Sequence, residues 1–288
     1  MKPQRRSLKA PAGETAAWVW PGDGPRRLLF AHANGFNAFT YRRMLSTLHA
    51  LTRVEIVAVD LRGHGATSLP ADPERQKGWD VYARDLADVI AGFDDRPLTL
   101  AGHSMGAASL ILAAAARGSA ERILAIEPVL LPRLVYALAR TPLHPVVRAR
   151  NPLYKGALTR FDGFESREAA LARYRKKPTF AGWAEGVLED YLQEGLTRRG
   201  ADWRLTCAPA WEAANFGEQQ HAMWRALRDV GGNVHILKAG RRSTVFRPES
   251  TRLNVAFMET WPEAGHLLPM EQPEAVARWL ADRMLARA

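Results

Sequence analysis

Short apolar runs alternate with longer amphipathic stretches along most of this 288-residue chain, and this alternation limits the possible folds more than any other feature. It predicts strands followed by helices, which build parallel sheets with helices on both faces. The expected strands are residues 28–32, 54–60, 98–102, 123–127, 234–239 and 253–259, with 15–20 as an antiparallel edge strand. The expected helices are residues 39–51, 79–92, 105–117, 217–230 and 274–287.

One segment, residues 128–211, interrupts the alternation. It contains no convincing strand and predicts several short helices, most clearly over 165–177 and 183–194. An insertion after a strand lies at the carboxyl edge of a parallel sheet, where ligands bind in such folds. We therefore expect a core of residues 1–127 and 212–288 with a helical cap formed by 128–211.

Aromatic residues are frequent in the expected cap. They either pack the cap onto the core, which is the more common role, or line a substrate pocket. Trp183 is the candidate for substrate binding. The full set is Tyr136, Phe161, Phe164, Tyr174, Phe180, Trp183, Tyr191 and Trp203.

The chain is basic, with 40 Lys and Arg against 30 Asp and Glu and a net charge of +10. The basic residues are scattered, and no basic run interleaved with aromatic residues is present, so we expect no specific nucleic-acid partner. The cap segment carries fourteen Arg and Lys against eight Asp and Glu. This local excess leaves an acidic substrate or an anionic lipid surface open as a partner.

Other classes of protein are excluded by composition. No run reaches the ~18 apolar residues of a membrane-spanning helix, and no apolar segment follows the first basic residues, so a cytoplasmic location is the default expectation. Cys207 is the single cysteine, which excludes an internal disulfide or a cysteine-based zinc site. We expect neither a metal nor an organic cofactor. The sequence indicates no particular oligomeric state.

The motif Gly-His-Ser-Met-Gly at residues 102–106 lies between an apolar strand and a helical run. This is G-x-S-x-G in the context that a nucleophilic serine requires. Glycines are needed because the serine stands on a strained turn where flanking side chains would collide with backbone. Ser104 is therefore the candidate nucleophile.

A serine needs a general base within hydrogen-bond reach. His266 follows the last expected strand, and the chain order of serine first and histidine last suits a hydrolase. Of the others, His103 lies inside the serine motif, while His32 and His64 belong to loop motifs. Four histidines have no motif around them and are expected at the surface or in the core: His49, His144, His221 and His235.

These residues, together with two further loops, resemble the α/β-hydrolase superfamily of serine esterases and lipases over nearly the whole chain outside the cap. The motifs are His-Ala-Asn-Gly-Phe at 32–36, Asp-Leu-Arg-Gly-His-Gly at 60–65, the serine motif, and residues 265–273. The resemblance implies a mostly parallel eight-stranded sheet flanked by helices, with the cap inserted after the sixth strand. It also implies an oxyanion hole made by the backbone amides of Phe36 and Met105.

Some loop residues have two readings. His32 and Asn34 either brace the oxyanion loop or contact substrate. By the same resemblance, Asp60 shapes a turn and packs against the serine motif, and it is not expected to be catalytic.

The chain departs from the family pattern at the acid that orients the histidine. Members usually carry an aspartate after the seventh strand, but residues 240–245 contain no carboxylate. Glu127 ends the sixth strand instead, and a carboxylate there is costly to bury without a partner such as a His266 imidazolium. Glu127 is therefore the candidate acid; the alternative is a structural ion pair with a cap arginine such as Arg133.

These parts predict a serine hydrolase that forms an acyl-enzyme. The expected substrate is a small-molecule carboxylic ester, thioester, lactone or amide with an apolar acyl group. Carbon–carbon bond hydrolysis and cofactor-free peroxidation are less favoured reactions of the same site. A catalytically idle fold that binds a small ligand is the alternative of a different class, supported by Ser243 and Thr244 where an acid usually stands.

Overall fold

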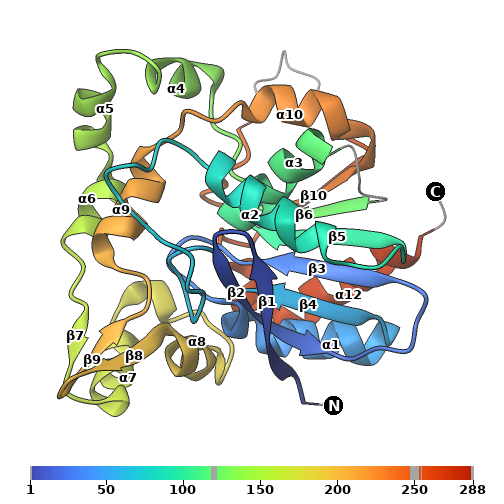
Figure 1. Ribbon diagram of the computed structural model, residues 1–288, viewed down its shortest axis with the longest axis horizontal. Coiled ribbons are helices and arrows are strands. Elements are labelled where there is room, and N and C mark those ends of the chain that lie inside the picture. The colour runs from blue at the N-terminus through green and yellow to red at the C-terminus, as the bar shows by residue number, and fades with distance from the viewer. Residues whose placement is uncertain (1, 118–121, 247–252, 254, 287–288) are drawn as a thin grey trace.

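One eight-stranded sheet runs through the protein in a computed structural model that describes residues 2–117, 122–246, 253 and 255–286 (Figure 1). Its first two strands are antiparallel to their neighbours and the other six are parallel. The predicted fold class is confirmed. In spatial order the strands are β1 (Gln4–Ala10), β2 (Gly13–Trp20), β4 (Glu55–Val59), β3 (Arg27–Ala31), β5 (Leu98–His103), β6 (Arg122–Ile126), β10 (Val234–Ala239) and β11 (Phe257–Trp261).

Helices cover both faces of the sheet. Leu28 and Phe30 of β3 pack toward α1 (Arg42–Thr52) and α12 (Pro273–Leu285), whereas Leu29 packs toward α2 (Asp80–Ala91), α3 (Met105–Arg117) and α10 (Met223–Val230). Successive side chains of a strand point to opposite faces. Because both faces are covered, the parallel strands are nearly continuous apolar runs, and each buried large aliphatic side chain contributes about 1.5–3 kcal/mol.

The strand order changes direction between β3 and β5. The chain passes from β3 to β4 on one side and then returns to place β5 on the other side of β3. Loops that leave the carboxyl ends of such strands diverge and open a crevice, the usual ligand site of an open α/β sheet. The loops after β3 and β5 carry the residues singled out from the sequence.

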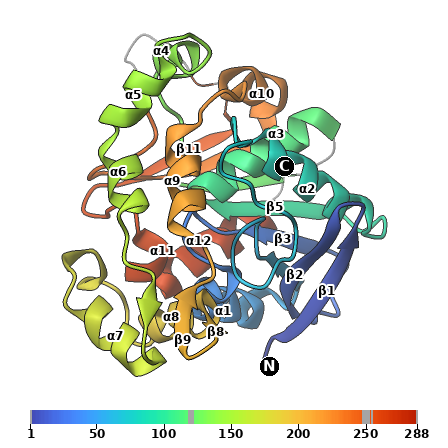
Figure 2. The same cartoon turned by 60° about the vertical axis from the view of Figure 1, so that its left-hand side comes forward.

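The segment between β6 and α9 (Pro209–Gly217) forms a separate layer beside the carboxyl edge of the sheet (Figures 1 and 2). Figure 2 shows α4, α5 and α6 following one another along one side of the molecule, with α7, α8 and a small sheet below them. The helices are α4 (Arg133–Leu138), α5 (His144–Arg150), α6 (Pro152–Leu158), α7 (Arg167–Arg175) and α8 (Val187–Gly195). A single-turn helix, α11 (Leu268–Glu271), precedes α12. No helix in the described part of the chain is long and apolar enough to cross a membrane.

Some expected elements were wrong. The cap segment does contain strands, β7 (Gly163–Phe164), β8 (Leu196–Arg199) and β9 (Asp202–Leu205), in an antiparallel sheet. They are too short and too rich in charged residues to give an alternating apolar pattern. A two-residue turn joins β8 to β9, and its Gly200 adopts a φ of 64°.

The other differences concern element boundaries. Residues 217–230 are not one helix, because the chain bends between α9 and α10 and the Gln220 amide donates to Lys77 O. β2 is not the edge strand, since the mostly exposed and polar β1 lies outside it. The last strand, predicted over 253–259, begins only at Phe257. Asn254 of that predicted strand and Arg287 at the end of the last predicted helix lie outside the described residues.

A buried carboxylate joins two loops at the end of β4. Asp60 is fully buried and accepts hydrogen bonds from the Ala38 amide at 2.8 Å and the Ala66 amide at 3.0 Å. A Cβ at Gly65, whose φ is +54°, would lie 2.1 Å from this carboxylate. Burial raises the pKa of Asp60 to about 6 against the opposing effect of the two amides. Asp60 therefore shapes the turn, as the sequence indicated.

The raised pKa of Asp60 predicts how stability depends on pH. Folding favours the protonated carboxyl, so its contribution is complete below the unfolded pKa of 3.8 and is lost as pH rises through about 6. Asp60→Asn lacks this titration. We compare the unfolding free energies of Asp60→Asn and wild type in urea. As pH rises from about 4.5 to about 7.5, we expect the free energy of the variant relative to wild type to increase by ~2 kcal/mol. A flat difference would show that the carboxyl titrates normally.

Candidate active site

Ser104 stands on the tight turn between β5 and α3. Its φ is 55°, a left-handed conformation that is uncommon for a residue with a side chain. A Cβ at Gly106 would lie 2.3 Å from Ala31 O, and one at Gly102 would lie 2.8 Å from the Ala107 amide. Close backbone contacts thus require glycine at both positions. The resulting turn places the Ser104 hydroxyl at the N-terminal end of α3.

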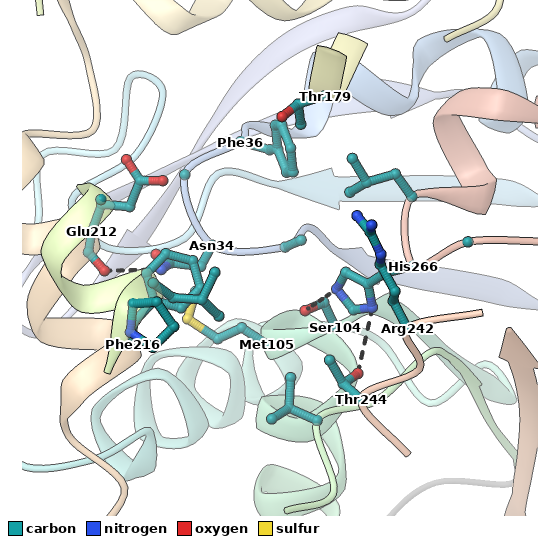
Figure 3. A pocket seen from close by; sticks show the side chains of 18 of the residues that line it. Asn34, Phe36, Ser104, Met105, Thr179, Glu212, Phe216, Arg242, Thr244 and His266 are labelled. Carbon is teal, nitrogen blue, oxygen red and sulfur yellow. Dashed lines mark hydrogen bonds between the residues drawn. The ribbon is translucent and has the colours of Figure 1, made fainter. Parts of the chain in front are cut away.

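Ser104, His266 and Glu127 form one line of hydrogen bonds. Ser104 Oγ lies 3.0 Å from His266 Nε2, and His266 Nδ1 lies 3.0 Å from Glu127 Oε2. Thr244 Oγ1 lies 3.4 Å from the same Nδ1 (Figure 3). Glu127 can only accept at Nδ1 when ionised, so Nδ1 carries the proton and Nε2 is free to accept the serine proton. The structure therefore brings together the three residues proposed from sequence.

The carboxylate of Glu127 crosses from the end of β6 to the end of β10. Its Oε1 accepts from the Ala239 amide at 2.6 Å and Ser243 Oγ at 2.7 Å, and its Oε2 accepts from the Thr244 amide at 3.0 Å. The residue is fully buried and has a φ of 46°. Glu127 thus places a carboxylate beside the loop that follows β10, the seventh strand of the large sheet. That loop, residues 240–245, contains no carboxylate of its own.

Burial alone would raise the pKa of Glu127. The hydrogen bonds from His266, Ser243 and the two backbone amides outweigh burial and hold this pKa below its usual value. The alternative partner Arg133 lies elsewhere, with its guanidinium 5.4 Å from the centre of the Trp224 ring.

His103, which precedes Ser104, holds the backbone of His266 in place. His103 Nε2 donates to His266 O at 2.8 Å, and its Nδ1 accepts from the Tyr41 hydroxyl at 2.7 Å. Tyr41 in turn accepts from the Ala33 amide. Burial, followed by the nearby His266, holds the pKa of His103 well below its ordinary value. This neutral side chain connects the oxyanion loop, the serine turn and the histidine loop.

Two further histidines support the loops from below. His32 donates from Nδ1 to Ala33 O and accepts at Nε2 from the Leu61 amide, while His64 accepts at Nε2 from the Gly35 amide. Burial lowers the pKa of His64 to about 4. Both ring nitrogens of His32 are occupied by backbone, and the ring is fully buried. Of the two readings left open by the sequence, these contacts favour bracing the loop over contacting substrate.

Phe36 and Met105, whose amides are expected to form the oxyanion hole, line the same cavity as Ser104. Met105 is the first residue of α3, and the N–H groups of a first helical turn have no partner within the helix. The Phe36 amide closes the turn onto Ala33 O at 3.3 Å, which is long for an N–H···O bond. Asn34 clamps this loop, since its amide donates to Glu212 O and its oxygen accepts from Asn215.

A cavity of ≈ 1720 Å³ opens above Ser104. Core loops form one wall, and α5, α6 and the residues after α7 form the other. Asn34 lines the cavity, whereas Trp183, the candidate for substrate binding, is not among the lining residues and packs with its ring centre 5.6 Å from that of Phe36. The sequence analysis missed Arg242, which also lines the cavity beside His266 (Figure 3). No cluster of three or more His, Cys, Asp or Glu suited to a metal occurs among the described residues.

The profile of the Alpha/beta hydrolase family matches residues 28–279, and the chain belongs to this family. A curated relative, a probable protein phosphatase methylesterase 1 of Caenorhabditis elegans, is 32% identical over 97 residues. That alignment covers 33% of this chain and 26% of the relative, so the chain matches about a quarter of the relative's length.

Solved structures share the fold across the chain. E-2-(acetamidomethylene)succinate hydrolase is similar with a TM-score of 0.72 and 20% identity, covering 99% of this chain and 100% of that one. A thioesterase domain from the curacin biosynthetic pathway is similar with a TM-score of 0.76 and 17% identity, covering 97% and 99%. These likenesses show the fold.

The hydroxyl of Ser243 should stabilise the ionised form of Glu127. A hydrogen bond to a charged group contributes about 1.5–3 kcal/mol, so Ser243→Ala should lower the unfolding free energy by about that amount at pH 7. Because the pKa of Glu127 is lowered in the folded state, this contribution is present above the unfolded value of 4.5 and lost as pH falls. The deficit of the variant should therefore shrink below about pH 4.5 in urea unfolding.

Ser109 provides the matched control for this experiment. Its hydroxyl is buried on α3 and has no hydrogen-bond partner among the described residues. Ser109→Ala should show no deficit that varies with pH. A deficit of Ser243→Ala that is equal at both pH values would mean that the hydroxyl does not stabilise the carboxylate.

Proposed function

We propose that this protein is a serine hydrolase that cleaves a small-molecule carboxylic ester, or a related thioester, lactone or amide, through a Ser104–His266–Glu127 triad. The observation that carries the proposal is the line of hydrogen bonds from Ser104 Oγ through both ring nitrogens of His266 to Glu127. Membership of the family and the elbow conformation of Ser104 support it.

In the proposed reaction, His266 removes the proton of Ser104 as the oxygen attacks the carbonyl carbon. The amides of Phe36 and Met105 receive the oxyanion, and each such donor is worth about 2.7–4 kcal/mol in a comparable site. The imidazolium returns the proton to the leaving group, and water repeats the cycle on the acyl-enzyme. Glu127 keeps the proton on Nδ1 and stabilises the imidazolium without being protonated.

The Phe36 amide is expected to move from its long turn bond to the oxyanion when substrate binds. Catalytic hydrogen bonds are often long before the substrate is present and tighten in the complex. On the cavity wall, Val129, Leu131, Phe161 and Phe216 offer apolar surface for an acyl chain, and this supports the expected apolar acyl group. Asn34 also lines the cavity, with its side-chain amide bonded to Glu212 O and Asn215.

Labelling with a fluorophosphonate probe tests the nucleophile without presupposing a substrate. Such a probe reacts with a serine whose base and oxyanion donors are assembled. We expect modification of wild-type protein at Ser104, mapped by mass spectrometry of the peptide, and none in Ser104→Ala. A folded wild-type protein that resists the probe would favour the idle fold that only binds a ligand.

Glu127→Gln tests the acid. Glutamine cannot hold the productive tautomer of His266, so turnover of a 4-nitrophenyl ester should fall by about 10⁴-fold. Glu274→Gln, an exposed carboxylate at the start of α12, is the matched control and should retain turnover. Near-ultraviolet circular dichroism confirms that both variants are folded. Turnover of Glu127→Gln within a few-fold of wild type would contradict the assignment.

A further inference from the structure

Arg242 places a positive charge beside the proposed base. It follows β10 and precedes by two residues Thr244, the hydroxyl that lies 3.4 Å from His266 Nδ1. Figure 3 shows its side chain extending past the His266 ring toward the cavity, which it lines. Arg242 is exposed and lines the same cavity as Ser104 and His266.

The backbone of Arg242 is strained. Among the described residues, four with side chains have a left-handed φ: Arg53, Ser104, Glu127 and Arg242, the last at 52°. Arg53 is explained as the residue that ends α1. Ser104 and Glu127 are the proposed nucleophile and acid. Residues held in unfavourable backbone conformations cluster at functional sites, and the fourth one is Arg242.

The charge of Arg242 is not used inside the protein. In the described part of the chain, it has no ion pair or hydrogen bond from its side chain. The neighbouring Arg241 instead pairs with Glu263 at 3.0 Å. Three carboxylates line the cavity: Glu212 pairs with Arg160 at 2.6 Å, Glu263 pairs with Arg241, and Glu271 has no ion pair among the described residues. The two arginines of this loop thus differ in one respect, since Arg241 is neutralised and Arg242 is not.

Two other cationic side chains add positive charge to the cavity. Lys177 and Arg173 line the cavity and form no ion pair with the carboxylates of the described residues. Burial, and then repulsion from Arg160 and Arg173, lower the pKa of Lys177. A negative substrate would remove this repulsion.

We propose that Arg242 is a substrate-binding residue that pairs with a carboxylate of the substrate, so that the preferred substrates are esters of carboxylate-bearing acyl compounds. The inference rests on the proposed function and names its substrate class. The planar guanidinium offers two parallel N–H donors that match a carboxylate. The apolar wall contacts the chain between the carboxylate and the ester.

Two esters of equal length test this preference. Mono-4-nitrophenyl glutarate carries a carboxylate, and methyl 4-nitrophenyl glutarate replaces it by a neutral methyl ester. We expect wild-type protein to have the higher kcat/KM for the anionic ester. Arg242→Gln should lower the anionic-to-neutral ratio of kcat/KM at least about 10-fold, mainly through KM, and Arg242→Lys should restore part of it.

Arg241→Gln is the matched control. It removes the same positive charge from the neighbouring residue, whose guanidinium is already paired with Glu263. Its ratio should stay within about 2-fold of wild type. An unchanged ratio in Arg242→Gln, or an equal fall in both variants, would overturn the assignment of Arg242.

A binding measurement separates this inference from the proposed function. Glutarate itself should bind the Ser104→Ala protein in calorimetry, and adding Arg242→Gln should weaken its Kd at least about 10-fold. This readout needs no hydrolysis, so it tests Arg242 even if the fluorophosphonate leaves Ser104 unmodified. Equal glutarate affinity with and without Arg242 would overturn the inference.

Discussion

The ionised carboxylate of Glu127 is the interaction on which the site depends. It is buried at the end of one strand and satisfied almost entirely by the end of the neighbouring strand and the loop that follows it. An unpaired carboxylate in this place would cost several kcal/mol. The loop from Ala239 to Thr244 must therefore take one particular path, and that path also places Thr244 and Arg242 around His266. One buried charge thus organises both sides of the imidazole.

The main parts of the site could be predicted from sequence because their causes are local. The glycines around Ser104 follow from the close approach of backbone to the turn, and His266 follows from its place after the last strand. Glu127 was proposed as the acid because residues 240–245 contain no carboxylate and the sixth predicted strand ends with one. The hydrogen-bond donors to Glu127 were harder to predict. Ser243 and Thr244 occupy the positions where an acid usually stands, and both donate hydrogen bonds to the Glu127 carboxylate.

The remaining features depend on contacts between distant segments. The β8–β9 hairpin is held by backbone pairing and a turn with one glycine. Because its side chains are largely charged, they show no apolar pattern from which the strands could be predicted. The break before α10 arises where Gln220 meets Lys77, far away in the sequence. The position of Arg242 depends on a left-handed backbone that nothing in its residue type indicates. Patterns of apolar residues report burial, and none of these features is a matter of burial.

The buried histidines show how rigidity and charge are separated in this fold. His32, His64 and His103 are held neutral, with lowered pKa values, and join the loops after β3, β4 and β5 through backbone hydrogen bonds. The one histidine of the site with an exposed edge is His266, the group proposed to gain and lose a proton. The neutral His103 ring, with its centre 5.0 Å from that of His266, fixes the geometry without adding a positive charge beside an imidazolium. Arg242, whose side chain has no ion pair among the described residues, lines the cavity, where a substrate can meet its charge.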